Sequence, residues 1–306
     1  MKAIITGATG AIGVALIKKL IKEKQEVLVI VRKDSQREKN IPTSPLVKRI
    51  YASLKELKEV VAENEYDTFY HLAWDGTVGI DRNNLQKQCD NVKYAVDAVD
   101  LAARFGCKTF IGVGSQAEYG RVNDSLSPET VTNPENGYGV AKLFAREMTA
   151  LQAEKCGLRH IWVRVLSIYG PYDGMQSLVM STIEKARRGE TISCTKGEQI
   201  WDYLYSDDAA EALYRLGVSS NAQGIYVLGS GTKRLLADYI KDIRDAINPS
   251  VKIDFGVVPY QPNQVMFLQA NIKKLQEDIN WMPKIGFPEG IKKLLETINN
   301  IKGEKQ

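Results

Sequence analysis

A glycine-rich turn close to the first residue constrains the fold of this chain more than any other feature. It reads TGATGAIG over residues 6–13, between an apolar run at residues 2–6 and an apolar pattern of helical period over residues 11–24. A strand that passes through closely spaced glycines into a helix is typical of a nucleotide-binding α/β sheet, where backbone N–H groups and a helix N-terminus face phosphates. The residues expected at the phosphates are Gly7, Thr9, Gly10, Ala11, Ile12 and Gly13.

The first half of the chain continues with alternating strand and helix patterns. Apolar runs of the kind that a parallel sheet buries on both faces predict four more strands, at residues 26–31, 46–51, 66–73 and 109–114. Helical patterns lie between them at the spacing of βαβ units, the longest at residues 83–105, and another helix begins near residue 137. We therefore predict an α/β fold with a Rossmann-type doubly wound parallel sheet over residues 1–166.

The second half is less regular. It holds a turn-rich segment at residues 169–174, a helix ending near Arg188 and a strand-like run, QIWDYLY, at residues 199–205. These patterns predict a smaller mixed α/β lobe over residues 167–306, the variable part of the fold and the part expected to hold a substrate. Some of its strands and helices are expected to return to the first sheet.

Composition limits the class of protein. The 306 residues are 44% apolar and 25% charged, as in ordinary globular proteins, and a net charge of +4 is too small to indicate a nucleic-acid partner. The four cysteines are far apart and lack metal-ligand spacing, so we expect reduced thiols and no metal site. With no signal peptide before the glycine turn and no membrane-spanning apolar run, we expect a cytoplasmic protein without a membrane partner.

The end of the second strand indicates which dinucleotide is bound. An acidic residue at this point holds the ribose hydroxyls of NAD, but here the strand ends in Val31 and continues with Arg32 and Lys33. Two cations suit the 2′-phosphate of NADP, which predicts NADP as the cofactor. Asp34 follows directly and keeps NAD as the alternative, and the two cations also fit a solvated loop.

A tyrosine and a lysine four residues apart, Tyr138 and Lys142 in YGVAK, point to catalysis. One helical turn separates them, so the lysine ammonium is placed to stabilise a phenolate and to hold the nicotinamide ribose. Ser115 follows the strand TFIGVG, at the carboxyl end of a parallel strand, where its hydroxyl is placed to polarise a carbonyl. We predict Ser115, Tyr138 and Lys142 as catalytic residues.

These motifs, in this order, resemble the extended short-chain dehydrogenases/reductases of the nucleotide-sugar epimerase and dehydratase kind. The segments that carry the resemblance are TGATGAIG at 6–13, HLAW at 71–74, GSQAEYG at 114–120, YGVAK at 138–142, RVLSIYGP at 164–171 and WDYLYSDDAA at 201–210. The resemblance implies a dimer packed through the helices near residues 91–105 and 138–155. It also implies that the cofactor contacts Ser53, Leu54, Leu72, Ala73 and Trp74.

Departures from the family pattern narrow the reaction that the resemblance implies. The sugar dehydratases carry an Asp-Glu pair after the catalytic hydroxyl, where this chain has Gln116 and Ala117, which argues against dehydration. The segments TKGEQIWDYLYSDDAA and QVMFLQAN are most similar to reductases of 4-keto-6-deoxyhexose nucleotides, such as synthases of CDP-abequose. The implied activity is thus an NADPH-dependent reduction with a proton from Tyr138. An epimerase with the same triad is the alternative, and a non-catalytic dinucleotide sensor is a third interpretation.

The residues expected at the substrate also differ from the family pattern. Family members place diphosphate-binding arginines where this chain has Trp201 and Tyr260 or Gln261, and an expected asparagine is Ser167. Either Arg187, Arg188 or Lys196 takes the place of these arginines, or the substrate is not a usual nucleotide sugar. The residues expected to line the sugar site are Ser115, Gln116, Tyr138, Ser167, Gln176 and Trp201.

Overall fold

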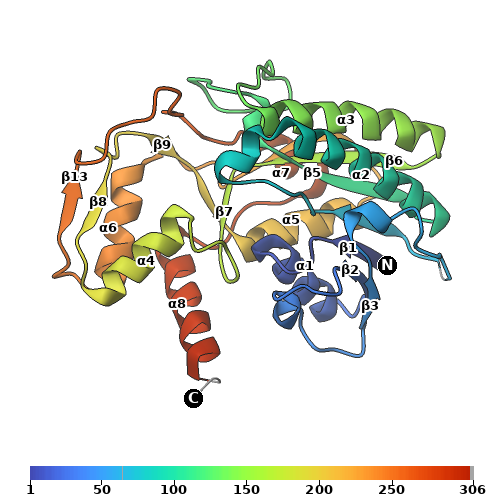
Figure 1. Cartoon of the computed structure of the whole chain (residues 1–306), viewed down its shortest axis with the longest axis horizontal. Helices are drawn as coiled ribbons and strands as arrows, with labels where there is room; N and C mark the ends of the chain where they lie inside the picture. Colours follow the sequence, from blue (N-terminus) through green and yellow to red (C-terminus); the bar gives the residue numbers. More distant parts are fainter. Residues whose placement is uncertain (64, 304–306) are drawn as a thin grey trace.

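The computed structural model describes residues 1–63 and 65–303, and in this part of the chain the main feature is a seven-stranded parallel sheet (Figure 1). The strand order is β11-β6-β5-β4-β1-β2-β3. The strands are β1 (Lys2–Thr6), β2 (Glu26–Val31), β3 (Val47–Tyr51), β4 (Thr68–His71), β5 (Thr109–Ser115), β6 (Arg159–Val165) and β11 (Gly224–Leu228). This arrangement confirms the predicted Rossmann-type α/β fold.

The order of the strands reverses between β1 and β4, which sets the position of the site. β1 pairs with β2 from Lys2↔Glu26 to Thr6↔Ile30, and with β4 from Ala3↔Thr68 to Thr6↔His71. The chain leaves β1 toward β2 on one side and later returns to β4 on the other side. A crevice therefore opens beyond the carboxyl ends of these strands, where ligands bind in sheets of this type.

Helices cover both faces of the sheet. One face packs against α2 (Leu85–Arg104) and α3 (Gly137–Lys155), and the other against α1 (Ala11–Lys22), α5 (Ser206–Val218) and α7 (Lys273–Ile279) (Figure 1). Short 3₁₀ helices are present at η1 (Glu38–Asn40), η2 (Leu54–Glu56), η3 (Gly79–Asn83) and η4 (Gln116–Glu118). No helix in the described part of the chain is both long and apolar enough to cross a membrane.

The remaining elements form a second body, which we call the small lobe. It contains α4 (Leu178–Arg188), α6 (Leu236–Ile247) and α8 (Phe287–Gly303), with two-stranded pairings of β7 (Ser167–Tyr169) with β10 (Tyr203–Tyr205), β9 (Ile200–Trp201) with β12 (Arg234–Leu235), and β8 (Ile192–Cys194) with β13 (Ile253–Phe255). The chain passes between the two bodies repeatedly: after the small lobe begins, α5 returns to pack on α1, and β11 pairs with β6.

The strand predicted over residues 199–205 is two short strands in different pairings, because Asp202 interrupts it. The Asp202 side chain is fully buried and accepts hydrogen bonds from the backbone of Ser230, Gly231 and Ala270 at 2.7–3.0 Å, and from the Ser230 hydroxyl at 2.7 Å. These hydrogen bonds link the segment around Asp202 to the segments at residues 230–231 and at residue 270. The chain therefore changes direction at Asp202, and β9 and β10 pair with different partners.

Candidate active site

The three glycines of the turn serve different purposes. A Cβ on Gly7, which has a φ of 75°, would lie 2.7 Å from the backbone at Leu72 and Ala73, and one on Gly13 would lie 2.3 Å from the Gly7 carbonyl oxygen. The fold itself requires these two glycines. A Cβ on Gly10 would meet only the Gly7 oxygen, at 3.9 Å. The space beside Gly10 is therefore not filled by protein atoms.

The first turn of α1 presents unused backbone donors to this space. Gly10 is the N-cap residue, and within this described helix no side chain caps the N-terminus and no acidic residue occupies the first turn. Helix N-terminal N–H groups without partners attract anions, and the helix dipole adds to the attraction. The space beside Gly10 therefore fits a phosphate group.

A cavity of about 410 Å³ continues from the glycine turn along the carboxyl ends of β1, β2 and β4. Of the residues expected at the cofactor, Gly7, Thr9, Gly10, Arg32, Ser53, Leu54, Leu72, Ala73 and Trp74 line it. Ala11, Ile12 and Gly13 lie in or beside the first turn of α1 and are not part of this wall. The lining residues fit a dinucleotide with its phosphates at the N-terminus of α1 and its adenosine toward Ser53 and Leu54.

The cations at the adenosine end differ from the sequence-based expectation. Arg32 lines the cavity, whereas Lys33 and Asp34, which follow it directly and are exposed like it, are not among the lining residues. Two further cations, Arg37 and Lys55, contribute to the wall. Arg37 also donates a hydrogen bond to the Tyr172 carbonyl of the small lobe. Sequence reasoning considered only the first residues after β2 and missed Arg37, although it belongs to the same loop.

Trp74 joins the cavity to the predicted catalytic residues. It lines the cavity, and its ring meets the Tyr138 ring edge-on with centroids 6.2 Å apart. The Lys142 Nζ lies 3.8 Å from the Trp74 ring centroid, in a cation–π contact. The indole N–H donates to Gln88 on α2 at 2.8 Å, which fixes the ring plane. The inner end of the cavity is therefore next to Tyr138 and Lys142.

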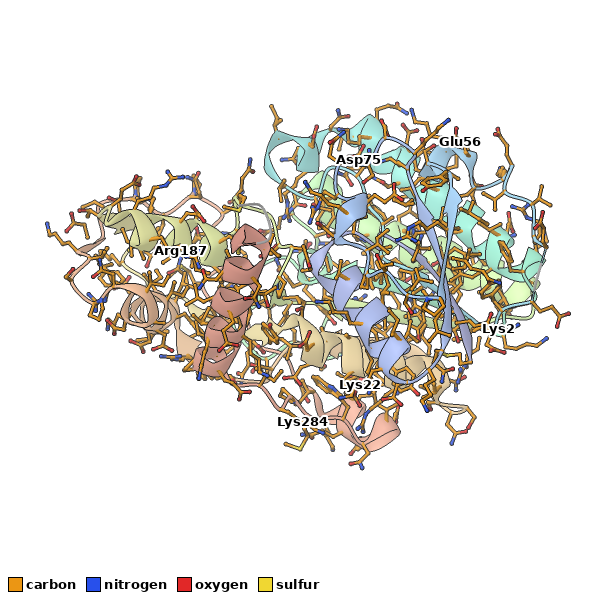
Figure 2. The ribbon with its side chains drawn as sticks, turned by 90° about the horizontal axis from the view of Figure 1, so that it is seen from below. Lys2, Lys22, Glu56, Asp75, Arg187 and Lys284 are labelled. Atoms are coloured by element: carbon orange, nitrogen blue, oxygen red, sulfur yellow. The ribbon has the colours of Figure 1, made fainter. Side chains whose placement is uncertain are left out.

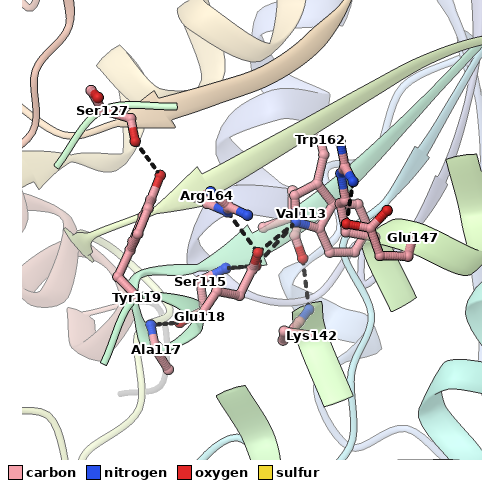
Figure 3. Close-up of polar contacts among 11 residues, drawn as sticks. Val113, Ser115, Ala117, Glu118, Tyr119, Ser127, Lys142, Glu147, Trp162 and Arg164 are labelled. Atoms are coloured by element: carbon pink, nitrogen blue, oxygen red, sulfur yellow. Dashed lines mark hydrogen bonds and ion pairs between the residues drawn. The ribbon is translucent and has the colours of Figure 1, made fainter. Parts of the chain in front are cut away.

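The structure brings the three predicted catalytic residues together. Ser115 ends β5, and Tyr138 and Lys142 lie one turn apart at the start of α3, which Asn136 caps by accepting a hydrogen bond from Gly139 at 2.9 Å. All three side chains are buried. The Lys142 ammonium donates to the Val113 carbonyl of β5 at 2.6 Å (Figure 3). This bond holds the lysine against the strand that carries Ser115.

Burial controls the charges of the pair. It raises the pKa of the Tyr138 hydroxyl above its usual value, although a hydrogen bond with Ser115 and the charge of Arg82 act in the opposite direction. Burial also lowers the pKa of Lys142 to about 7, against the opposing negative charge of Glu118. At neutral pH, Tyr138 is therefore protonated, as a proton donor must be, and Lys142 lies close to its titration midpoint.

Arg82 is a further site residue that sequence reasoning missed. Its guanidinium carbon lies 4.7 Å from the Tyr138 ring centroid, and it belongs to η3 between β4 and α2. No motif marks this position, because the contact depends on how the β4–α2 connection folds over α3. Its charge favours the deprotonated form of Tyr138.

Some of the residues expected to contact the substrate already have hydrogen-bond partners within the protein. The Ser167 hydroxyl accepts a hydrogen bond from the Trp201 indole at 2.8 Å, so these two side chains are paired with each other. Gln116 is half-buried directly after Ser115, and Gln176 is exposed in the loop before α4. Of the candidate replacement cations, Arg187 lies on the small lobe (Figure 2) and donates to Asn299 on α8 at 2.6 Å. Arg188 pairs with Glu184 and Glu190, and Lys196 is exposed between β8 and β9.

The fold and this site define a nucleotide-binding α/β protein with a serine, a tyrosine and a lysine at the end of its cofactor-sized cavity. Residues 3–229 match the NAD dependent epimerase/dehydratase family, and the chain belongs to that family. This match confirms the family resemblance seen in the sequence. The chain is therefore a member of a family of NAD-dependent enzymes.

Curated relatives match along almost the whole chain. CDP-abequose synthase of Salmonella typhimurium is 25% identical over 96% of this chain and 97% of its own length. The dTDP-4-dehydro-6-deoxyglucose reductase of Escherichia coli is 24% identical over 96% of both chains. Among solved structures, UDP-glucose 4-epimerase of Thermotoga maritima with UDP-glucose superposes with a TM-score of 0.85 at 22% identity, covering 98% of this chain and 99% of that one. This structural likeness shows that the fold is shared.

Proposed function

We propose that the protein is an NADPH-dependent reductase of a nucleotide-linked 4-keto-6-deoxyhexose. The observation that supports the cofactor is the presence of Arg32 and Arg37 in the cavity wall at the end of β2, where NAD-binding sheets carry an acidic residue. The relatives named as CDP-abequose synthase and dTDP-4-dehydro-6-deoxyglucose reductase support the substrate class, because they match over the full chain.

The proposed chemistry assigns one task to each buried side chain. The inner end of the cavity, beside Trp74 and Lys142, would hold a reduced nicotinamide, which would supply a hydride to the carbonyl carbon. The Ser115 hydroxyl donates a hydrogen bond to the carbonyl oxygen as negative charge develops there. Tyr138 gives its proton to that oxygen and becomes a phenolate, which the Lys142 ammonium stabilises. The products are the alcohol and the oxidised cofactor, and solvent later returns the proton to Tyr138.

The test is a direct assay of NADPH oxidation with the CDP- and dTDP-linked 4-keto-6-deoxyglucoses. We expect one NADPH consumed for each sugar nucleotide reduced, and slower turnover with NADH. Interconversion of sugar isomers without net consumption of NADPH would instead identify an epimerase that uses the same triad. Tight NADPH binding without turnover of any nucleotide sugar would favour the sensing function.

We also propose that the protein forms a dimer through α2 and α3. Large apolar side chains are exposed along one stripe of α3, at Val140, Phe144, Met148 and Leu151, with exposures of 37–64%. Their spacing places them on one helix face, and Leu85 at the start of α2 is 65% exposed. An apolar stripe of this kind is typical of a protein interface.

Substitution of Phe144 by glutamate is expected to convert the dimer to monomers, because it places a charge in the middle of the apolar stripe. Sedimentation equilibrium measures the change. Val218→Glu is the matched control, since Val218 is similarly exposed (48%) but lies on α5, away from this face. A wild-type protein that sediments as a monomer would contradict the proposal.

A further inference from the structure

A buried carboxylate lies directly beneath the predicted catalytic residues and has no role in the mechanism above. Glu118, in η4, is fully buried and accepts three kinds of hydrogen bond. Its donors are the Ser115 backbone N–H at 2.8 Å, the Trp162 indole at 3.0 Å and the Arg164 Nε at 2.6 Å (Figure 3). Burial of an ion pair is costly unless each partner is well satisfied, so the sequence retains this carboxylate at some expense.

The contacts of Glu118 restrict the geometry of Ser115. The carboxylate accepts a hydrogen bond from the Ser115 backbone N–H, and the Ser115 hydroxyl accepts one from the Glu118 backbone N–H, so the two residues form a reciprocal capping box. The Ser115 hydroxyl also accepts a hydrogen bond from the Ala117 N–H at 3.2 Å. A Cβ on Gly114 would lie 2.3 Å from the Glu118 carboxylate, which shows how closely the carboxylate packs under β5. Glu118 thereby determines where β5 ends and how the Ser115 hydroxyl is presented.

Glu118 also contributes a negative charge near the catalytic pair. The other groups whose fields reach Lys142 or Tyr138 are His71 on β4 and Arg82 on η3. Arg164 on β6 is paired with Glu118. His71 is neutral at physiological pH because burial and Lys142 lower its pKa to about 3, and the arginines are positive. Within the described residues near the pair, Glu118 is thus the group that favours a charged Lys142.

We propose that Glu118 is a positioning residue of the reductase: its carboxylate sets the position of Ser115 and places a negative charge on β5 two residues from the Val113 carbonyl that holds the Lys142 ammonium. The catalytic role that we assign to Glu118 rests on the proposed function. The electrostatic coupling between Glu118 and Lys142 is a property of the protein without cofactor or substrate. The coupling between Glu118 and Lys142 can therefore be tested separately from the proposed function.

The first experiment titrates Lys142 in the cofactor-free protein by NMR of ¹³C-labelled lysine, with the signal assigned by its loss in Lys142→Met. A lysine that titrates near pH 7 is separated from ordinary lysines, which titrate near 10.4. In Glu118→Gln, loss of the negative charge disfavours protonated Lys142, so its pKa is expected to fall by about one unit. An unchanged titration in folded Glu118→Gln would overturn the inference.

The second experiment measures the pH profile of kcat and the binding of NADPH. Reduction is expected to decline as pH rises through the titration of Lys142, and in Glu118→Gln this decline moves to lower pH. We also expect kcat to fall about 10- to 100-fold through misplacement of Ser115, while the Kd for NADPH does not change. A shifted lysine titration with an unshifted pH profile would overturn the catalytic role of Glu118. Absence of NADPH oxidation in the wild type would contradict the proposed function instead.

Two more variants separate the role of Glu118 from general destabilisation. Glu118→Leu with Arg164→Met removes both charges of the ion pair and so leaves no unpaired charge buried, although the Ser115 N–H and the Trp162 indole lose their acceptor. This double variant is expected to show the same directions of change in the Lys142 titration and in kcat. Glu147→Gln removes an exposed carboxylate from the same helix as Lys142, and we expect it to leave both measurements unchanged.

Discussion

Replacement of Tyr138 by phenylalanine is expected to lower kcat about 1,000-fold, because it removes the proton donor of the reduction while leaving the ring in place. The hydroxyl is buried next to Ser115, and no other titratable hydroxyl is assigned to the developing alkoxide. The edge-on contact with Trp74 and the contact with Arg82 involve the ring, so they remain in the variant. NADPH affinity, measured by fluorescence titration, should therefore stay at the wild-type level.

The matched control is Tyr226→Phe, which removes another buried phenolic hydroxyl far from the site. The Tyr226 hydroxyl donates to Asp278 at 2.6 Å between β11 and α7, so its loss is expected to lower the melting temperature without lowering kcat. A Tyr138→Phe variant that retained more than about a tenth of the wild-type kcat would fall outside the range of lost general-acid catalysis and would remove Tyr138 from the mechanism.

Replacement of both Arg32 and Arg37 by glutamine is expected to remove the preference for NADPH. Each charge-assisted contact with a phosphate contributes about 1.5–3 kcal/mol, so the Kd for NADPH should rise by about 100-fold or more. The Kd for NADH should hardly change, because NADH lacks the 2′-phosphate. Fluorescence titrations with the two cofactors measure both values.

The lysine that follows Arg32 provides the control for this experiment. Lys33→Gln removes the same charge from the same loop, but Lys33 is outside the cavity wall, and we expect no loss of NADPH affinity. If Lys33→Gln weakened NADPH binding as much as the double variant, the loss of affinity would come from the overall charge of the loop. The proposed contact of Arg37 with the 2′-phosphate would then be wrong. Equal wild-type affinities for NADPH and NADH would contradict the cofactor proposal altogether.

The sequence was sufficient to predict the first two strands of the sheet. β1 and β2 begin and end at the expected residues, since both are uninterrupted apolar runs bounded by a clear turn. Ser115, Tyr138 and Lys142 were also found, because each has a fixed place relative to a strand end or a helix turn. Their catalytic roles remain predictions until the substitutions are made.

Other features depend on contacts between distant segments, which a single sequence does not reveal. Asp202 divides a predicted strand because its carboxylate binds backbone groups near residues 230 and 270. Glu118 was passed over because its partners Trp162 and Arg164 lie on another strand. Arg37 lies just before η1 and Arg82 lies in η3, in connections whose path is set by packing, and their charges alone resemble those of a solvated surface.

The path of the chain between the two bodies has a consequence for synthesis on the ribosome. β6 lies between β5 and β11, and its pairing with β11 extends from Ile161↔Gly224 to Val165↔Leu228. A nascent chain that has emerged only to residue 166 therefore has an open sheet edge at β6 and an α1 face without α5. The nucleotide-binding sheet cannot be completed before residue 228 has emerged, after much of the small lobe has already been made.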